Sequence, residues 1–590
     1  MVLSLVMASC APKVVEKEKV KEEEKAVVTK KVEEVKVEKE VVKPTVEVPK
    51  YGGELALSAV MDPIIFDERG SPFHANAYTL QLTNEELVIG DWARGPAGTG
   101  EADFTLTVGG FRFITGCLAE SWEIPKLGHI IFHIRKGVHY ALNPNSEASR
   151  LVNGRELTAY DVATTLNEYK TTPGSAASYA DFVKATVTAP DKWTVDIQIP
   201  PQYMEDISVT MDYASICAPE VWQKYGSMRD WRNSVGTGPF ILTDYIAGSL
   251  VTLSRNPNYW MKDPVGQGKG NQLPYLDGVK FVIIQDNSTR LAALRTGKID
   301  VLHGITWTDA GSLRNTSPAL LEKKYYGTGG MAISMRTDKP ELPFSKKDVR
   351  RALMMATDFE TIKKDYCGGD AQILTWPIIY QKEYADAYLP LEEAPASVQE
   401  LYVYNPDKAR QLLKDAGYPN GFKTKIVCTF AGVDYLSIIK DMWAKVGVSL
   451  EIDPVEVGAF TGITAKREYD QMIFSGAGLV ANLYIMETLR GHIAFGNLSH
   501  INDPRCEEAY TKMCELSVLN PTEANRVHKE LMSYVLDQAW AIPYVTPASY
   551  NMWWPWLKNY HGESDLGRSN FPKWARFVWI DQGLKKSMGY

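Results

Sequence analysis

The segments VGTGPF at residues 235–240 and RNPNYW at residues 255–260 form the most specific pattern in this sequence. Both glycines of the first segment can adopt backbone angles closed to other residues, and the proline fixes the direction in which the chain leaves. This composition predicts a tight turn that brings chain crossovers together. A phosphate-binding loop is excluded, because neither Lys-Ser nor Lys-Thr follows the glycines.

On both sides of this turn, strand-like runs alternate with capped helices. Strands are predicted at residues 55–60, 130–134, 194–199, 250–253, 279–284 and 299–302. Helix starts are predicted by two capping-box pairs, Thr158 with Asp161 and Ser345 with Asp348, and by Asn405 ahead of a proline. Because strands and helices intermix along the whole globular part, the sequence predicts the α/β fold class.

The composition indicates a large folded protein with more than one lobe. Its 590 residues are 45% hydrophobic and 23% charged, which excludes disordered, collagen-like and small disulfide-stapled proteins. The formal net charge of −8 gives no basic excess for neutralising phosphates, so we expect no nucleic acid among the partners. The sequence contains no run of about 18 apolar residues, so any membrane attachment needs another device.

The first fifty residues differ from the rest of the chain. Residues 1–10 (MVLSLVMASC) resemble the end of a bacterial lipoprotein signal, in which Cys10 is lipidated and becomes the mature N-terminus. No Lys or Arg precedes the short apolar run, and we expect the natural start codon to lie upstream. Residues 11–50 hold 11 Lys and 10 Glu interleaved with valine, which is typical of a solvated low-complexity tether. The alternative is an ordinary N-terminus with a chance cysteine.

Four segments, taken in order, resemble the extracellular solute-binding proteins that serve oligopeptide and dipeptide ABC transporters, known as family 5. They are residues 116–162, which include LAESW, FHIRKGV and NGRELTAYDV; the VGTGPF and RNPNYW pair; LRTGKID at residues 294–300; and residues 343–419, which include VRRAL and NPDKA. Their order and spacing extend the resemblance over most of the chain beyond the tether.

This resemblance implies a two-lobed fold like that of periplasmic binding proteins, with an extra subdomain in the first lobe and two crossover strands between the lobes. Lobe one is expected at residues 51–326 and 545–590, and lobe two at residues 327–544. The crossovers are expected near residues 325–326 and 542–545. A solute that binds both lobes at once would favour the closed state.

The resemblance also places a ligand-binding loop of lobe two at residues 474–484 (FSGAGLVANLY). Peptide-binding relatives carry an aspartate there, which neutralises the α-amino group of the ligand. This sequence has no carboxylate between Asp470 and Glu487, so a free peptide N-terminus would lose its partner, at a cost of roughly several kcal/mol. Aromatic side chains could instead line the cleft for sugar rings or apolar ligands. The predicted ligand-binding residues are Trp307, Trp376, Ser475, Gly476, Ala477, Gly478, Asn482 and Tyr484.

The sequence lacks the common motifs of catalysis and of metal binding. The sequence contains no HExxH, GxSxG, Walker or CxxC motif, so no catalytic residue, cofactor or metal site is predicted. His129 and His133 are four residues apart, but in a strand-like run this spacing does not form a helical zinc pair. The six cysteines other than Cys10 could form disulfides in an exported protein or stay buried thiols. Only a bond between Cys506 and Cys514 is excluded, because about 12 Å would separate them on one helix.

We therefore expect a lipid-anchored, monomeric receptor at the cell surface or in the periplasm. It would capture an extended solute, such as an oligopeptide or oligosaccharide, and deliver it to the permease subunits of an ABC transporter. Two alternatives belong to other classes: an exported hydrolase on a similar scaffold, which would turn over the compound it binds, and a surface adhesion or chaperone-like protein, whose open cleft would not close on small solutes.

Overall fold

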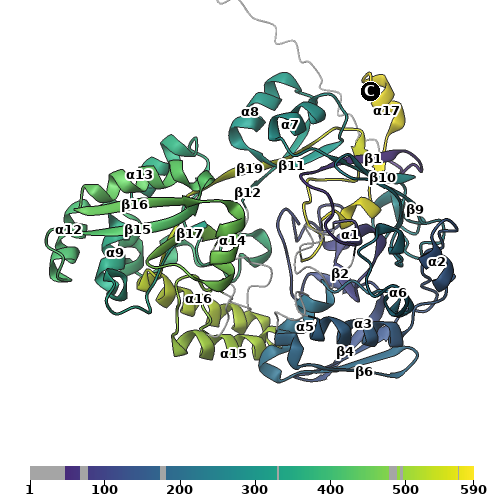
Figure 1. Ribbon diagram of the computed structural model, residues 1–590, viewed down its shortest axis with the longest axis horizontal. Helices are drawn as coiled ribbons and strands as arrows, with labels where there is room; N and C mark the ends of the chain where they lie inside the picture. Colours follow the sequence, from purple (N-terminus) through teal and green to yellow (C-terminus); the bar gives the residue numbers. More distant parts are fainter. Residues whose placement is uncertain are drawn as a thin grey trace, which may run out of the picture. The chain divides into compact units, whose positions relative to one another are not determined.

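The computed structural model describes residues 47–66, 78–172, 181–327, 331–476, 488–491, 496–568 and 571–590. Val48–Tyr590 form one compact unit, shown in Figure 1. Among the described residues, three large clusters of buried apolar side chains form the interior of this unit. Each cluster belongs to its own assembly of strands and helices.

The first cluster lies around a sheet with the strand order β1-β10-β9-β8, together with the sheet β11-β19-β12. The strands are β1 (Glu54–Ala59), β8 (Phe240–Ile246), β9 (Leu250–Arg255), β10 (Gly278–Ile283), β11 (Val301–Thr306), β12 (Leu321–Tyr326) and β19 (Thr546–Trp553). The short strands and helices of this assembly are α1 (Leu80–Thr83), β2 (Val88–Gly90), β3 (Ile114–Gly116), α7 (Asn287–Arg295), α8 (Trp307–Thr316), β20 (Leu557–Lys558), η14 (Lys573–Arg576), β21 (Trp579–Ile580) and α17 (Gln582–Ser587).

The second cluster forms the core of a subdomain built on the sheet β4-β5-β7-β6. Its elements are β4 (Ala119–Lys126), β5 (His129–Ile134), α2 (Glu147–Val152), α3 (Ala159–Thr171), η4 (Asp181–Lys184), β6 (Thr186–Asp191), β7 (Thr194–Gln198), η5 (Pro201–Tyr203), α5 (Met204–Met211) and α6 (Pro219–Tyr225). Alternate residues of β5 are buried, as expected for a strand with one face on a core. This assembly is the extra subdomain of the first lobe.

The third cluster lies around the five-stranded sheet β16-β15-β17-β13-β18, which we call the second lobe. Its strands are β13 (Met331–Met335), β15 (Phe422–Thr429), β16 (Val448–Val455), β17 (Met472–Gly476) and β18 (Ala541–Pro543). The main helices are α9 (Lys347–Met355), α12 (Pro406–Asp415), α13 (Val433–Ala444), α14 (Val457–Lys466), α15 (Pro504–Leu519) and α16 (Pro521–Gln538). Shorter elements are α10 (Phe359–Thr361), β14 (Ala371–Gln372), η10 (Lys382–Tyr384), α11 (Ala396–Gln399) and η13 (Phe430–Gly432).

The chain passes twice between these assemblies. Strand β12 lies in a first-lobe sheet and the next strand, β13, lies in the second-lobe sheet, while β18 and β19 make the return passage. In Figure 1, β12 and β19 run from the second-lobe sheet towards α7 and α8. The predicted crossovers fall at these two passages, and the expected two-lobed α/β fold is confirmed. The predicted lobe boundaries themselves stay a prediction.

Local signals identified two helix starts correctly and misread a third. Thr158 and Asp161 form the expected capping box of α3, and the Asn405 side chain accepts a hydrogen bond from the Lys408 N–H at the start of α12. The box predicted at Ser345 is wrong. Ser345 ends a 3-10 helix (Pro343–Ser345), and its hydroxyl donates to the Leu342 oxygen at 2.8 Å. Helix α9 begins without a side-chain cap.

The VGTGPF turn owes its glycines to close packing. A Cβ at Gly236 would lie 2.1 Å from the backbone oxygen of Thr83, and one at Gly238 would lie 2.5 Å from that of Leu82. Neither glycine has a positive φ, which corrects the expected reason for their presence. They allow the first-lobe chain to touch α1 without side chains between the two backbones.

All six cysteines of the globular part are buried free thiols, which decides between the two alternatives left open by the sequence. Cys506 and Cys514 both lie in α15 and do not pair. Among the described residues, no helix is both long and apolar enough to cross a membrane.

Candidate functional site

The carboxyl ends of three second-lobe strands meet at one edge of the sheet. Strand β15 pairs in parallel with both β16 and β17, so the carboxyl ends of these strands lie near one another. Two apolar side chains at this edge face solvent: Phe430 after β15 is 61% exposed, and Val457 after β16 is 67% exposed. Ligands of open α/β sheets bind at such an edge, and exposed apolar side chains there suit an apolar or planar group.

An aromatic cluster lies beside this edge. The rings of Tyr435 and Phe474 are stacked, with centroids 5.4 Å apart and planes inclined by 14°. Tyr544, in the return crossover, packs edge-on against Tyr435 at 4.6 Å, and Tyr366 lies 5.9 Å from Tyr435. Burial raises the pKa of the Tyr435 and Tyr544 hydroxyls, which are therefore neutral at physiological pH. The cluster joins the crossover to the carboxyl end of β17.

The turn that follows Tyr366 contacts the first lobe. The indole of Trp307, at the start of α8, lies against Gly368 and is 37% exposed. Asp370 accepts hydrogen bonds from Tyr326 at 2.7 Å and from Lys324 at 3.0 Å, both in β12. Burial alone would raise the pKa of Asp370, but these two bonds lower it. The predicted ligand residue Trp307 is thus positioned against a second-lobe turn.

The other predicted ligand residues divide into three groups. Ser475 and Gly476 lie at the carboxyl end of β17, and Gly476 is exposed. Trp376 is 2% exposed and packs in the second-lobe core, where its indole fills space among apolar side chains. The remaining predictions, at Ala477, Gly478, Asn482 and Tyr484, fall outside the described residues, as does Cys10.

A second-lobe segment around η10 reaches into the first lobe. The Glu383 carboxylate, 7% exposed, accepts hydrogen bonds from the backbone N–H groups of Asp103 at 2.7 Å and Phe104 at 3.2 Å. The Tyr384 hydroxyl bonds to both backbone groups of Gly109, and its ring packs against the first-lobe core. No sequence signal identified this contact, because each partner is an ordinary residue in an irregular segment.

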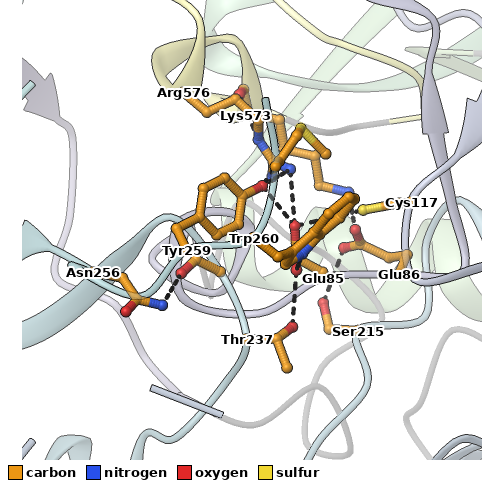
Figure 2. A network of polar contacts seen from close by, with 12 residues as sticks. Glu85, Glu86, Cys117, Ser215, Thr237, Asn256, Tyr259, Trp260, Lys573 and Arg576 are labelled. Carbon is orange, nitrogen blue, oxygen red and sulfur yellow. Dashed lines mark hydrogen bonds and ion pairs between the residues drawn. The ribbon is translucent and has the colours of Figure 1, made fainter. Parts of the chain in front are cut away.

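The segments VGTGPF and RNPNYW converge on one buried carboxylate, shown in Figure 2. Glu85 accepts hydrogen bonds from Thr237 of VGTGPF at 3.0 Å, and from Tyr259 and Trp260 of RNPNYW at 2.7 and 2.8 Å. Arg576 of η14 forms an ion pair with the same carboxylate at 3.2 Å, and both charged side chains are fully buried. The specific sequence pattern therefore builds a polar framework within the first lobe.

A second buried pair lies beside the first. Lys573 of η14 bonds to Glu86, and both side chains are fully enclosed. Burial alone would lower the pKa of the Arg576 guanidinium, but Tyr259 and Glu85 raise it above its usual value, so it stays charged. Because both pairs are enclosed, they hold the C-terminal segment to the start of β2 and do not contact a solute. Sequence reasoning missed Glu85 and Glu86, whose only signal is a pair of acids directly before an apolar strand.

His129 and His133, the two histidines spaced four apart, each pair with a carboxylate of the same sheet. His129 bonds to Asp196 at 2.8 Å and His133 to Glu123 at 2.7 Å, each within the subdomain sheet. Within the described ranges, no group of three or more His, Cys, Asp or Glu side chains could hold a metal ion.

Two lobes joined by paired crossovers, with an exposed apolar edge beside them, define a two-lobed binding protein. The chain belongs to the bacterial extracellular solute-binding proteins of family 5, because residues 114–483 match the family described as "Bacterial extracellular solute-binding proteins, family 5 Middle".

Similar proteins include heme-binding protein A of Haemophilus influenzae, 27% identical over 477 residues that cover 76% of this chain and 81% of that protein. The glutathione-binding protein GsiB of Shigella boydii is 27% identical over 285 residues, 46% of this chain and 50% of GsiB. The chain therefore matches only half the length of GsiB.

Solved structures share the fold. The periplasmic binding protein DppA from Helicobacter pylori, in complex with the peptide STSA, has a TM-score of 0.68 at 23% identity, covering 90% of this chain and 99% of DppA. AgaA from A. tumefacien R10, in complex with agropinic acid, has a TM-score of 0.68 at 19% identity, covering 90% of this chain and 99% of AgaA.

Proposed function

We propose that this protein is a lipid-anchored receptor that captures an extended solute between its lobes and delivers it to the permease of an ABC transporter. The observation that carries the proposal is the membership in family 5 together with the paired crossovers, about which two lobes can close on a guest. The sequence of residues 1–10, ending at Cys10, supports a lipid anchor, and residues 11–50 would hold the folded body away from the membrane.

The proposed solute class rests on the sequence that follows β17 and on the surface character of the second-lobe edge. Between Asp470 and Glu487 the sequence contains no carboxylate to pair with an ammonium group. Phe430 and Val457 supply exposed apolar surface at the same edge, next to the Tyr435 and Phe474 stack. We therefore favour a solute without a free α-amino group at this end, such as a blocked peptide, an oligosaccharide or an opine-like compound. Structures of this fold hold both a peptide and agropinic acid, which supports such a range.

Thermal unfolding of the full chain against matched pairs of compounds tests this class. Each tetrapeptide is compared with its N-acetylated form, and oligosaccharides and opines complete the panel. A bound compound at about 100 times its dissociation constant adds about 2.7 kcal/mol to the free energy of unfolding. Stabilisation by the free peptides but not by their acetylated forms would contradict the proposed solute class.

Native mass spectrometry of the protein purified from its own source tests capture itself. We expect an intact small molecule that dissociates unchanged. Recovery of a cleaved product would favour the hydrolase alternative. Absence of any bound molecule, together with no stabilisation across the panel, would contradict the receptor function.

A further inference from the structure

We propose that Arg490 is the latch that holds the two lobes closed on the side away from the crossovers. The guanidinium is 2% exposed and is shared between two carboxylates: Asp181 of the first-lobe subdomain at 3.4 Å and Glu507 of α15 at 3.5 Å. This inference rests on the proposed function, because it assumes that the lobes open and close.

The second lobe presents the arginine. The Arg490 backbone oxygen accepts a hydrogen bond from the Asn497 side chain at 3.1 Å, and the following N–H, of Gly491, donates to Glu507 at 3.1 Å. The guanidinium lies over the Tyr510 ring, 3.5 Å from its centroid. All these partners belong to the second lobe, whereas the contact with Asp181 crosses between the lobes.

The surroundings of Asp181 extend the same interface. Lys184, one turn further in η4, bonds to Asp181 at 2.6 Å and lies over the Tyr203 ring at 3.7 Å. Tyr203 packs against both the subdomain core and the second-lobe core, and α15 contacts η5 and α5. The ion pair therefore sits within a packed contact between the lobes and is shielded from water, which strengthens it.

The position of this contact suits a latch. In Figure 1 the crossover strands β12 and β19 lie above the middle of the view, below α7 and α8, whereas α15 and α5 lie near the bottom. A rotation about the crossovers displaces the most distant contact furthest, so opening would break the pair of Arg490 and Asp181 first. After separation, Arg490 keeps Glu507 and Asp181 keeps Lys184, so neither charge is left alone. The contact can therefore form and break at modest cost.

Distances between spin labels, measured by double electron–electron resonance without added solute, test the latch. The full chain carries Cys10→Ser, and labels are attached at Thr188→Cys in β6 and Lys512→Cys in α15, both exposed positions. The native thiols of the globular part are buried and should not take up label. In Asp181→Asn, we expect the ratio of separated to closed lobes to rise about tenfold, because the carboxylate charge that pairs with Arg490 is lost and the remaining hydrogen bond is weaker.

The matched control is Lys184→Gln, which removes a different charged partner of Asp181 but leaves the contact with Arg490. It should keep the distance distribution of the parent. An unchanged distribution in Asp181→Asn, or an equal shift in both variants, would overturn the latch. Circular dichroism confirms that both variants are folded. Because this comparison needs no solute, its failure is distinct from a failure of the proposed function, which the compound panel and native mass spectrometry report.

Discussion

A Cβ at Gly368 would lie 2.9 Å from Cζ3 of Trp307, so the indole of the first lobe rests directly on the backbone of a second-lobe turn. Gly368 also has a φ of +69°, which side-chain-bearing residues rarely adopt. The contact ties α8 to the turn between the aromatic cluster and β14, and it exists only because this position lacks a side chain.

Gly368→Ala should therefore lower the free energy of unfolding by more than Gly369→Ala. Gly369 also has a positive φ, +87°, but a Cβ there would meet open space. In each variant the left-handed backbone costs about 1–2 kcal/mol of stability. Only Gly368→Ala must also displace the Trp307 indole. Urea denaturation followed by tryptophan fluorescence measures both. Equal losses would show that Trp307 moves aside freely.

The enclosed carboxylate Glu85 should be among the most sensitive positions of the first lobe. Glu85→Gln leaves the buried Arg576 guanidinium without its counter-charge, for an expected loss of about 3–5 kcal/mol in unfolding free energy. The control is Glu322→Gln, which breaks the partly exposed pair with Arg314 and should cost at most about 1 kcal/mol. Similar losses of unfolding free energy in the two variants would contradict a central role for the hydrogen bonds and the ion pair at Glu85.

The free thiols should be unreactive in the folded protein. Burial raises the pKa of Cys367 and Cys428 to about 11 and that of Cys506 to about 12, so little thiolate is present near neutral pH. In the Cys10→Ser chain, a thiol reagent at pH 8 should label almost nothing until denaturant is added, and then all six remaining cysteines. Rapid labelling of any site under native conditions would contradict the observed burial.

Stability should fall between about pH 6.5 and pH 4 through buried histidines. Burial lowers the pKa of His528 from 6.5 to about 4, so the unfolded chain binds a proton that the folded chain does not. Above pH 6.5 the buried, neutral His528 carries no penalty. As the pH falls towards 4, protonation of the unfolded chain lowers the free energy of unfolding by up to about 3 kcal/mol. Urea denaturation of His528→Gln at several pH values should show a shallower dependence. Parallel curves for variant and wild type would refute this assignment.

Phe430→Ala should weaken solute binding without lowering stability, because this side chain is 61% exposed at the carboxyl edge of β15. Val403→Ala, 60% exposed outside that edge, serves as the control and should bind normally. We expect Phe430→Ala to bind the solute about tenfold more weakly, because the variant no longer buries an aromatic side chain against the solute. Titration calorimetry with whichever panel compound binds measures it, and equal affinities would move the site away from this edge.

Much of the fold could be predicted from local sequence. The capping box of Thr158 with Asp161 and the asparagine cap at Asn405 are interactions within one turn, so their residues suffice to identify them. Ser345 looked the same in sequence, yet its hydroxyl donates backwards to the Leu342 oxygen and α9 begins after Lys346 without a side-chain cap. Only the folded chain shows whether a candidate side chain lies where it can accept from the first N–H groups of the helix.

The candidate site was less predictable. No local sequence signal distinguishes Trp307 from Trp376. Yet Trp307 lies partly exposed against Gly368, whereas Trp376 is buried in the second-lobe core. Glu383, Arg490 and Asp181 carried no pattern at all, because their partners lie in distant segments. Contacts between lobes depend on how two independently packed cores meet, which short-range periodicity does not encode.

By itself the sequence determined the family, the class of fold, the helix caps that depend on neighbours, and the absence of a carboxylate between Asp470 and Glu487. Only the tertiary structure decided that VGTGPF and RNPNYW converge on Glu85, that the thiols stay unpaired, and which side chains join the lobes. The physical reason is range: propensities and caps act over a few residues, whereas buried charge pairs and interlobe contacts form between segments that meet only after each core has packed.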